Sequence, residues 1–182
     1  MSLEIISLAI PVFLAFAGYM ITYWHNLRLA KRKEQLDLVN KRLNDFYGPL
    51  YITSQAGYSA YKTLLTKLNR KSIFEKTDPP PDDHVLEEWR IWLTTVFMPL
   101  NEIREQLILE NAHLIREEQM PECLLQFIAH VSVYKAIVKK WELGDYSEHA
   151  PLIDYPQDLM HYLSVSYREL KEEQMRLIGK RR

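Results

Sequence analysis

The most constraining feature of the sequence is an uncharged run of 20 residues from Ile5 to Trp24. A helix rises about 1.5 Å per residue, so a run of this length matches the ~30 Å hydrocarbon core of a bilayer. Its end carries Tyr19, Tyr23 and Trp24, and such aromatic rings favour the headgroup region. The run therefore predicts a single transmembrane helix, with which Pro11 is compatible when neighbouring groups satisfy the carbonyl that it leaves free.

Two other interpretations of this run stay open. A cleaved signal peptide would use Ala15 and Ala17 as its small-residue cleavage motif, but its positive charges would precede the apolar run, whereas here they follow it. A buried core helix is the second alternative, although 20 uncharged residues is long for one.

A basic segment follows the run: residues 25–42 hold six Lys or Arg against two acidic residues. Cytoplasmic flanks of membrane helices carry such an excess, which also attracts anionic lipid. We expect a single-pass protein of a bacterial inner membrane, with its N-terminus outside and residues 25 onward in the cytoplasm. The lipid-facing residues form a basic collar, which consists of Arg28, Lys31, Arg32 and Lys33.

Small residues on the predicted membrane helix point to self-association. Gly18 and Thr22 form a small-xxx-small pair, and Ala15 lies one turn earlier. Such residues let two helices approach closely, so we predict helix packing through this face and a homo-oligomer. The alternative for the Thr22 hydroxyl is a bond to its own helix backbone.

The rest of the chain predicts helices and no strand. No Gly or Pro falls between Gly18 and Gly48, which predicts one helix out to about Tyr47, ended by Gly48-Pro49. Further helices are expected at about 50–69, from Asp82 or Asp83 with a break or kink at Pro99, at 121–142, and from Pro156 to about Ile178. The helix at 121–142 is apolar on almost every side, which is typical of a buried central helix.

These elements predict an all-α fold in which a single N-terminal transmembrane helix continues into a cytosolic bundle of four to five helices. Residues 1–33 would be the anchor and basic neck, and residues 34–182 the bundle, with a proline-rich loop at 70–83. The sequence shows no evident internal repeat.

Composition and motifs exclude several kinds of chemistry. The single cysteine, Cys123, excludes an intrachain disulfide and a four-cysteine zinc site, and we expect it to be a small buried hydrophobe. The 6 histidines fall in no metal-binding pattern, and the 5 glycines form no phosphate-binding loop. A net charge of -1 argues against general DNA binding. We therefore predict no metal, no cofactor and no enzymatic activity.

Four polar residues remain as candidate ligand-binding groups. His130 lies among apolar residues of the helix at 121–142, and Asn101, Arg104 and His113 lie where an antiparallel neighbour would bring them near it. The alternatives are a core histidine satisfied by a neighbouring polar group, and capping or solvation for the other three.

A short helical bundle on one membrane span, with a long first helix and polar residues near helix ends, resembles the divergent HEPN-like proteins. Small membrane-anchored members of that group accompany CRISPR and other phage-defence systems, and some assemble into rings that open a membrane pore. RNA-cleaving members carry an Arg followed four to six residues later by His. No Arg here has that spacing, the nearest pair being Arg104 and His113, so the resemblance does not extend to the nuclease motif.

Three hypotheses follow. The first is a non-enzymatic membrane effector or adaptor that acts as an oligomer, through its membrane helix and bundle. The second is an RNA-binding or RNA-cleaving module tethered to the membrane, using Arg104, His113 and His130. The third is a structural tether for a cytosolic partner protein.

Overall fold

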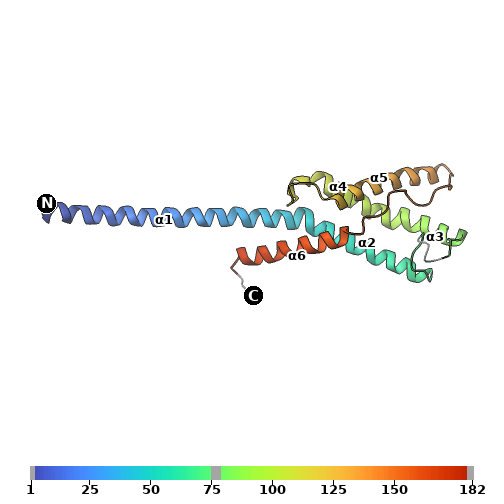
Figure 1. Ribbon diagram of the computed structural model, residues 1–182, viewed down its shortest axis with the longest axis horizontal. Coiled ribbons are helices and arrows are strands. Elements are labelled where there is room, and N and C mark those ends of the chain that lie inside the picture. The colour runs from blue at the N-terminus through green and yellow to red at the C-terminus, as the bar shows by residue number, and fades with distance from the viewer. Residues whose placement is uncertain (1–2, 75–78, 180–182) are drawn as a thin grey trace. The chain divides into compact units, whose positions relative to one another are not determined.

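The computed structural model describes residues 3–74 and 79–179, with side chains from residue 11 onward. Every regular element in that part of the chain is a helix, which confirms the all-α prediction (Figure 1). The α-helices are α1 (Leu3–Arg42), α2 (Gly48–Lys67), α3 (Asp83–Trp92), α4 (Met98–Glu110), α5 (Glu122–Glu142) and α6 (Leu159–Leu177). The described chain also contains two π-helical turns, η1 (Leu43–Tyr47) and η2 (Leu93–Phe97), and one 3-10 turn, η3 (Ala112–Leu114).

The chain forms two compact units. The first comprises residues 1–40 and 173–182, and the second comprises residues 41–172. In the first unit, the end of α6 runs antiparallel to α1. Arg32 Nε donates to the Leu177 carbonyl at 2.6 Å, and Gln174 Nε2 donates to Asn40 Oδ1 at 2.6 Å.

α1 is one uninterrupted helix that includes Pro11. Within the part whose side chains are described, from Pro11 onward, no helix combines the length and apolar character needed to cross a membrane. Residues 5–10 of the predicted span lie outside that part.

The expected end of the first helix at Gly48-Pro49 is wrong, because the chain stays helical through the proline. Proline has no N–H to donate to the carbonyl four residues back, and its ring clashes with that carbonyl. The π turn η1 adds one residue to the helical repeat, so the Gly48 amide donates instead to the Leu43 carbonyl. Pro49 then occupies the first turn of α2, where no donor is required.

The same local arrangement recurs 50 residues later. Residues 43–50 read LNDFYGPL and residues 93–100 read LTTVFMPL, with Leu, Pro and Leu in identical positions. In η2 the Met98 amide donates to the Leu93 carbonyl, directly before Pro99. Both turns bury their first Leu and their last aromatic residue, Tyr47 and Phe97.

In the second unit, α2 packs against α4, and α4 packs against α5. The α3 helix begins as expected: the Asp82 side chain accepts a hydrogen bond from the Val85 amide at 2.9 Å and caps it. The expectation that α5 is buried on every side is wrong. Its buried residues follow helical spacing along one face, and Leu125 is 46% exposed.

We predict that Gly48→Ala destabilises the second unit. A Cβ on Gly48 would overlap the Leu43 carbonyl oxygen that closes the π turn, so the backbone itself would have to shift. The expected loss is about 2 kcal/mol in the free energy of unfolding, although alanine is the better helix former. Chemical denaturation measures it. Gly18→Ala is the control, because nothing lies within 4 Å of its added Cβ, and an equal loss in both variants would contradict the steric argument.

Candidate functional site

The second unit contains a buried arginine whose hydrogen-bond partners are all neutral. Arg104 on α4 is only 3% exposed. Its Nε donates to the Leu100 carbonyl at 3.2 Å. Its Nη1 donates to Ser54 Oγ at 3.4 Å and to the Tyr155 hydroxyl at 3.1 Å, and its Nη2 donates to Asn101 Oδ1. These bonds join α2, α4 and the segment that precedes α6.

Two further contacts shape the space around this guanidinium. Its plane lies over the Phe127 ring of α5, with 4.9 Å from Arg104 Cζ to the ring centroid, which is a cation–π arrangement. Gly57 of α2 faces Nη2, and a Cβ there would come to 3.4 Å from it. A larger residue at position 57 would therefore push the guanidinium out of place.

No carboxylate pairs with Arg104 among the described residues. Burial lowers its pKa from the usual value, yet an arginine stays charged in proteins. Burying a cation costs hydration free energy. Because Arg104 has no counter-ion in the described part of the chain, only its hydrogen bonds and the Phe127 ring offset this cost. The guanidinium therefore connects the helices through hydrogen bonds. A change in helix packing that broke these bonds would leave a buried charge without partners and destabilise the fold.

His130 lies beside this network on α5. Its Nδ1 is 2.7 Å from the Ile153 carbonyl, and because a carbonyl only accepts, Nδ1 carries the proton. The imidazole packs edge-on against Tyr134 and Tyr155, with centroid distances of 5.0 and 5.5 Å. Burial lowers the pKa of His130. The histidine is therefore neutral at pH 7, and it holds the segment before α6 in place together with Gln126, whose side chain donates to the Asp154 carbonyl.

The structure brings three of the four predicted ligand-binding residues together. Asn101 bonds directly to Arg104, and Tyr155 contacts both Arg104 and His130. Asn101, Arg104 and His130 are all buried, so the cluster is closed to a macromolecular ligand. His113 lies apart on η3, where it is exposed, and among the described residues no hydrogen bond, ion pair or ring contact joins it to the other three.

Sequence reasoning missed Tyr155, Ser54 and Gly57. Tyr155 follows a long loop whose path is not encoded locally. A glycine in the middle of α2 is a detectable signal, because glycine weakens a helix interior unless a neighbour needs the space. Ser54 lies five residues after Pro49, and Arg104 lies five residues after Pro99, so the two residues hold equivalent positions after the two prolines.

A second polar cluster was also missed. The Tyr162 hydroxyl donates to the Glu117 carboxylate at 3.0 Å, and the hydroxyls of Tyr47 and Tyr162 are 3.1 Å apart. The Arg116 amide donates to the Tyr47 hydroxyl at 3.2 Å. Burial raises the pKa of both phenols, so they remain neutral donors. This cluster fixes the connection between α4 and α5 to η1 and α6.

The single cysteine is poorly suited to nucleophilic catalysis. Cys123 is half-buried, and burial raises the pKa of its thiol, which keeps it protonated and weakly nucleophilic. Among the described residues, no group of three His, Cys, Asp or Glu side chains is placed to hold a metal ion.

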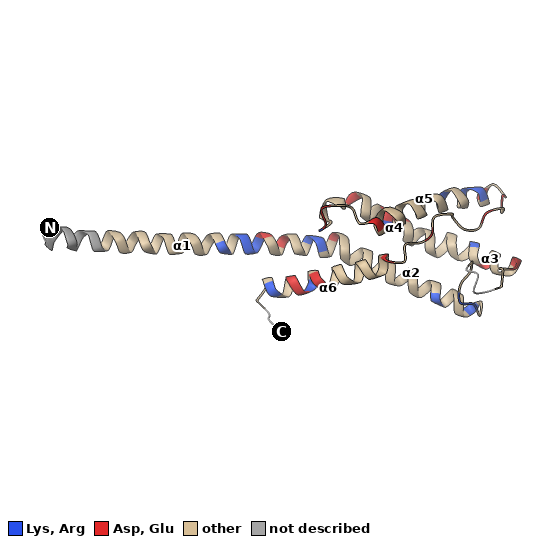
Figure 2. Cartoon of the chain, viewed as in Figure 1, with Lys and Arg blue, Asp and Glu red and all other residues tan. Residues whose placement is uncertain are grey.

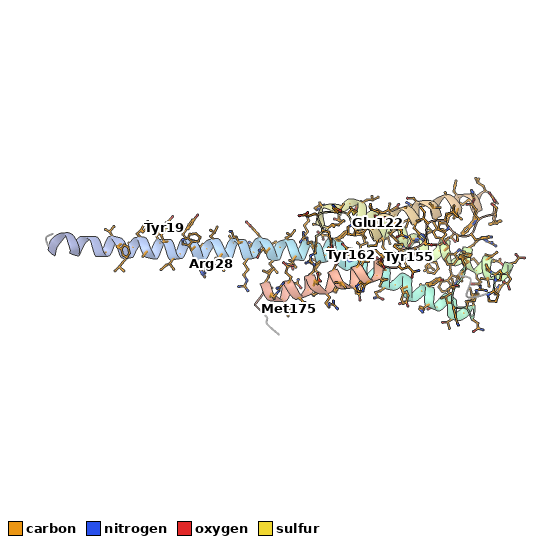
Figure 3. The ribbon with its side chains drawn as sticks, in the orientation of Figure 1. Tyr19, Arg28, Glu122, Tyr155, Tyr162 and Met175 are labelled. Atoms are coloured by element: carbon orange, nitrogen blue, oxygen red, sulfur yellow. The ribbon has the colours of Figure 1, made fainter. Side chains whose placement is uncertain are left out.

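The residues predicted for membrane-helix packing lie on one exposed face of α1. Ala15, Gly18 and Thr22 are all exposed, and Thr22 Oγ1 donates to the Gly18 carbonyl of its own helix at 2.9 Å. The basic collar is exposed as well, and Figure 3 shows Tyr19 and Arg28 projecting outward from α1.

No family model matches the chain, and neither a curated protein nor a solved structure matches it.

We predict that stability depends on the protonation of His130. The unfolded chain binds a proton near pH 6.5, whereas the folded chain, with its lowered pKa, binds it only at lower pH. The free energy of unfolding therefore falls as the pH drops below about 6.5 and levels off below the folded pKa. His149, whose pKa burial also lowers, adds in the same direction.

His130→Gln keeps a donor for the Ile153 carbonyl and removes the titration. Its stability should change less than that of the wild type between about pH 6.5 and about pH 5, measured by denaturant unfolding of the chain. His161→Gln, at an exposed position of α6, is the control. Parallel curves for His130→Gln and the wild type would contradict the assignment.

Proposed function

We propose that this protein is a non-enzymatic, membrane-anchored helical bundle, held by α1 as a single span with the bundle in the cytoplasm. The observation that carries the proposal is the exposure of large apolar side chains around α1. The exposed fractions are 62–70% at four positions: Val12 66%, Phe13 70%, Leu14 62% and Ile21 70%. Phe16, Tyr19 and Trp24 are exposed as well.

These side chains need a covering that the described chain does not provide. Successive residues turn by about 100° around a helix, so consecutive exposed positions such as 12, 13 and 14 face different directions. Burying a Leu, Val, Ile or Phe side chain is worth about 1.5–3 kcal/mol. A covering that surrounds the helix on every side fits the bilayer interior better than a partner protein that would cover one face.

Length and flanking residues support the same interpretation. The uncharged run Ile5–Trp24 has the length of the hydrocarbon core, including the residues whose side chains are not described. Tyr19 and Tyr23 stack along the helix with ring centroids 6.4 Å apart, at the end where a headgroup region would lie. The basic collar follows, which orients residues 25 onward toward the cytoplasm.

Self-association through α1 is the second part of the proposal. Ala15, Gly18 and Thr22 form a smooth exposed face, and the Thr22 hydroxyl is already satisfied by the Gly18 carbonyl. Two such faces approach closely without leaving a polar group unpaired in the membrane. Assembly of the span would be the physical basis of the effector activity that the HEPN-like resemblance implies.

The anchor is tested by placing a charge inside the span. A lysine at the centre of a membrane helix costs about 2.5–3.5 kcal/mol of insertion free energy, so Leu14→Lys should move most of the protein out of the membrane fraction that resists alkaline carbonate extraction. Leu143→Lys is the matched control, because Leu143 is 77% exposed but lies after α5. Extraction of the wild-type chain by carbonate would overturn the proposal.

Self-association is tested by filling the small-residue face. Gly18→Leu combined with Thr22→Leu should weaken oligomers at least tenfold in mild detergent, as measured by light scattering, because the helices can no longer approach closely. A Cβ at Gly18 meets nothing within 4 Å, so the change carries no clash within the monomer.

The control for that double variant is Phe16→Leu with Met20→Leu, about half a helical turn away from the small-residue face. This control should leave the oligomer unchanged. An equal mass for both double variants and the wild type would remove the packing argument.

A further inference from the structure

The end of α6 lies beside the basic collar of α1. Arg32 Nε donates to the Leu177 carbonyl at the C-terminus of α6, where a cation also interacts favourably with the helix dipole. Gly179 has a φ of +79°, and a Cβ there would lie 3.3 Å from Arg32 Nη2. The chain therefore leaves α6 directly beside Arg32, in a conformation that favours glycine.

This contact gathers cations from both ends of the sequence. Arg28, Lys31 and Lys33 on α1 and Arg176 on α6 are exposed, and no ion pair holds any of them among the described residues. We call these four residues the two-helix basic surface. The sequence continues with Lys180, Arg181 and Arg182, which lie outside the described residues.

Acidic residues lie next to this surface along both helices, and none is ion-paired with its four cations among the described residues. Glu34 and Asp37 on α1 and Glu173 on α6 all lie on the side away from the apolar segment. Figure 2 shows blue at the end of α6 and in the middle of α1, with red next to it on both helices and blue again at the end of α1. The four cations of the surface have no ion-pair partner among the described residues.

We propose that the two-helix basic surface binds the phosphate-bearing headgroups of anionic lipids, with Arg32 as the residue that positions α6. The inference rests on the proposed membrane anchor, because the apolar segment ends at Trp24, four residues before Arg28. Headgroup phosphates lie at that level of a bilayer, and each nearby Lys or Arg contributes about 1 kcal/mol toward an anionic membrane. No aromatic side chain is interleaved with these cations, which disfavours single-stranded nucleic acid.

The role of Arg176 distinguishes this proposal from a topology signal on α1 alone. A positive-inside signal needs only the residues that directly follow the span. If headgroups bind across both helices, the removal of a charge 145 residues beyond Lys31 must weaken lipid binding.

The test measures lipid binding to the detergent-solubilised full chain by native mass spectrometry, with phosphatidylglycerol and phosphatidylcholine as probes. We expect the wild type to bind phosphatidylglycerol more tightly, and Arg176→Gln to weaken that binding about fivefold, the equivalent of one headgroup contact. Arg168→Gln, at an exposed position of the same helix, is the matched control and should have no effect. Equal affinities for Arg176→Gln and Arg168→Gln would overturn the proposal.

A double-mutant cycle tests the role of Arg32. Arg32→Lys keeps the charge but loses the planar donor that reaches the Leu177 carbonyl. In this background the effect of Arg176→Gln should fall to less than twofold, and hydrogen exchange at residues 174–179 should speed up. An unchanged fivefold effect would show that Arg32 does not position α6.

Vesicle flotation separates the two proposals. Failure of the wild type to float with either neutral or anionic vesicles would overturn the membrane anchor. Equal flotation with both vesicle types, together with no preference for phosphatidylglycerol in the mass spectra, would overturn only the headgroup site.

Discussion

The fold of the second unit depends on how two helices accommodate a proline. Pro49 and Pro99 each lack the amide that a regular helix requires, and each follows a π turn whose widened repeat moves the obstructed carbonyl aside. The chain thereby stays helical where a break was expected. The two turns set the starting points of α2 and α4, which pack against one another.

The buried arginine is a consequence of that pairing. Ser54 and Arg104 occupy equivalent places after the two prolines, and their side chains meet at 3.4 Å. A helix pair held only by apolar contacts tolerates sliding, whereas a planar guanidinium with four hydrogen-bond acceptors fits one arrangement. The absence of a carboxylate partner among the described residues makes the cluster a determinant of packing specificity rather than a strong source of stability.

Local patterns in the sequence predicted the helices and most of their ends, because capping and turn residues act over a few positions. Asp82 caps α3, and Gly144 ends the α5 segment with a positive φ. The polar cluster was predicted in part: spacing placed Asn101, Arg104 and His130 near one another. Tyr155 and the Tyr47–Tyr162 pair depend on where long loops return, and no local pattern encodes such contacts. The burial of α5 was overestimated, because the number of apolar residues in a helix does not show on how many sides other helices pack against it.

Contacts over long sequence separations also define the first unit, and these bear most directly on the proposed membrane anchor. Neither the basic collar nor the end of α6 is informative alone, since exposed cations are common on helices. Arg32 connects the two, because its hydrogen bond to the Leu177 carbonyl holds the end of α6 beside the collar. The four cations of the two-helix basic surface have no ion-pair partner among the described residues. Unpaired cations from two helices therefore lie at one level beyond the apolar part of α1. Under the proposed anchor, this is the level at which the headgroups of an anionic membrane would lie.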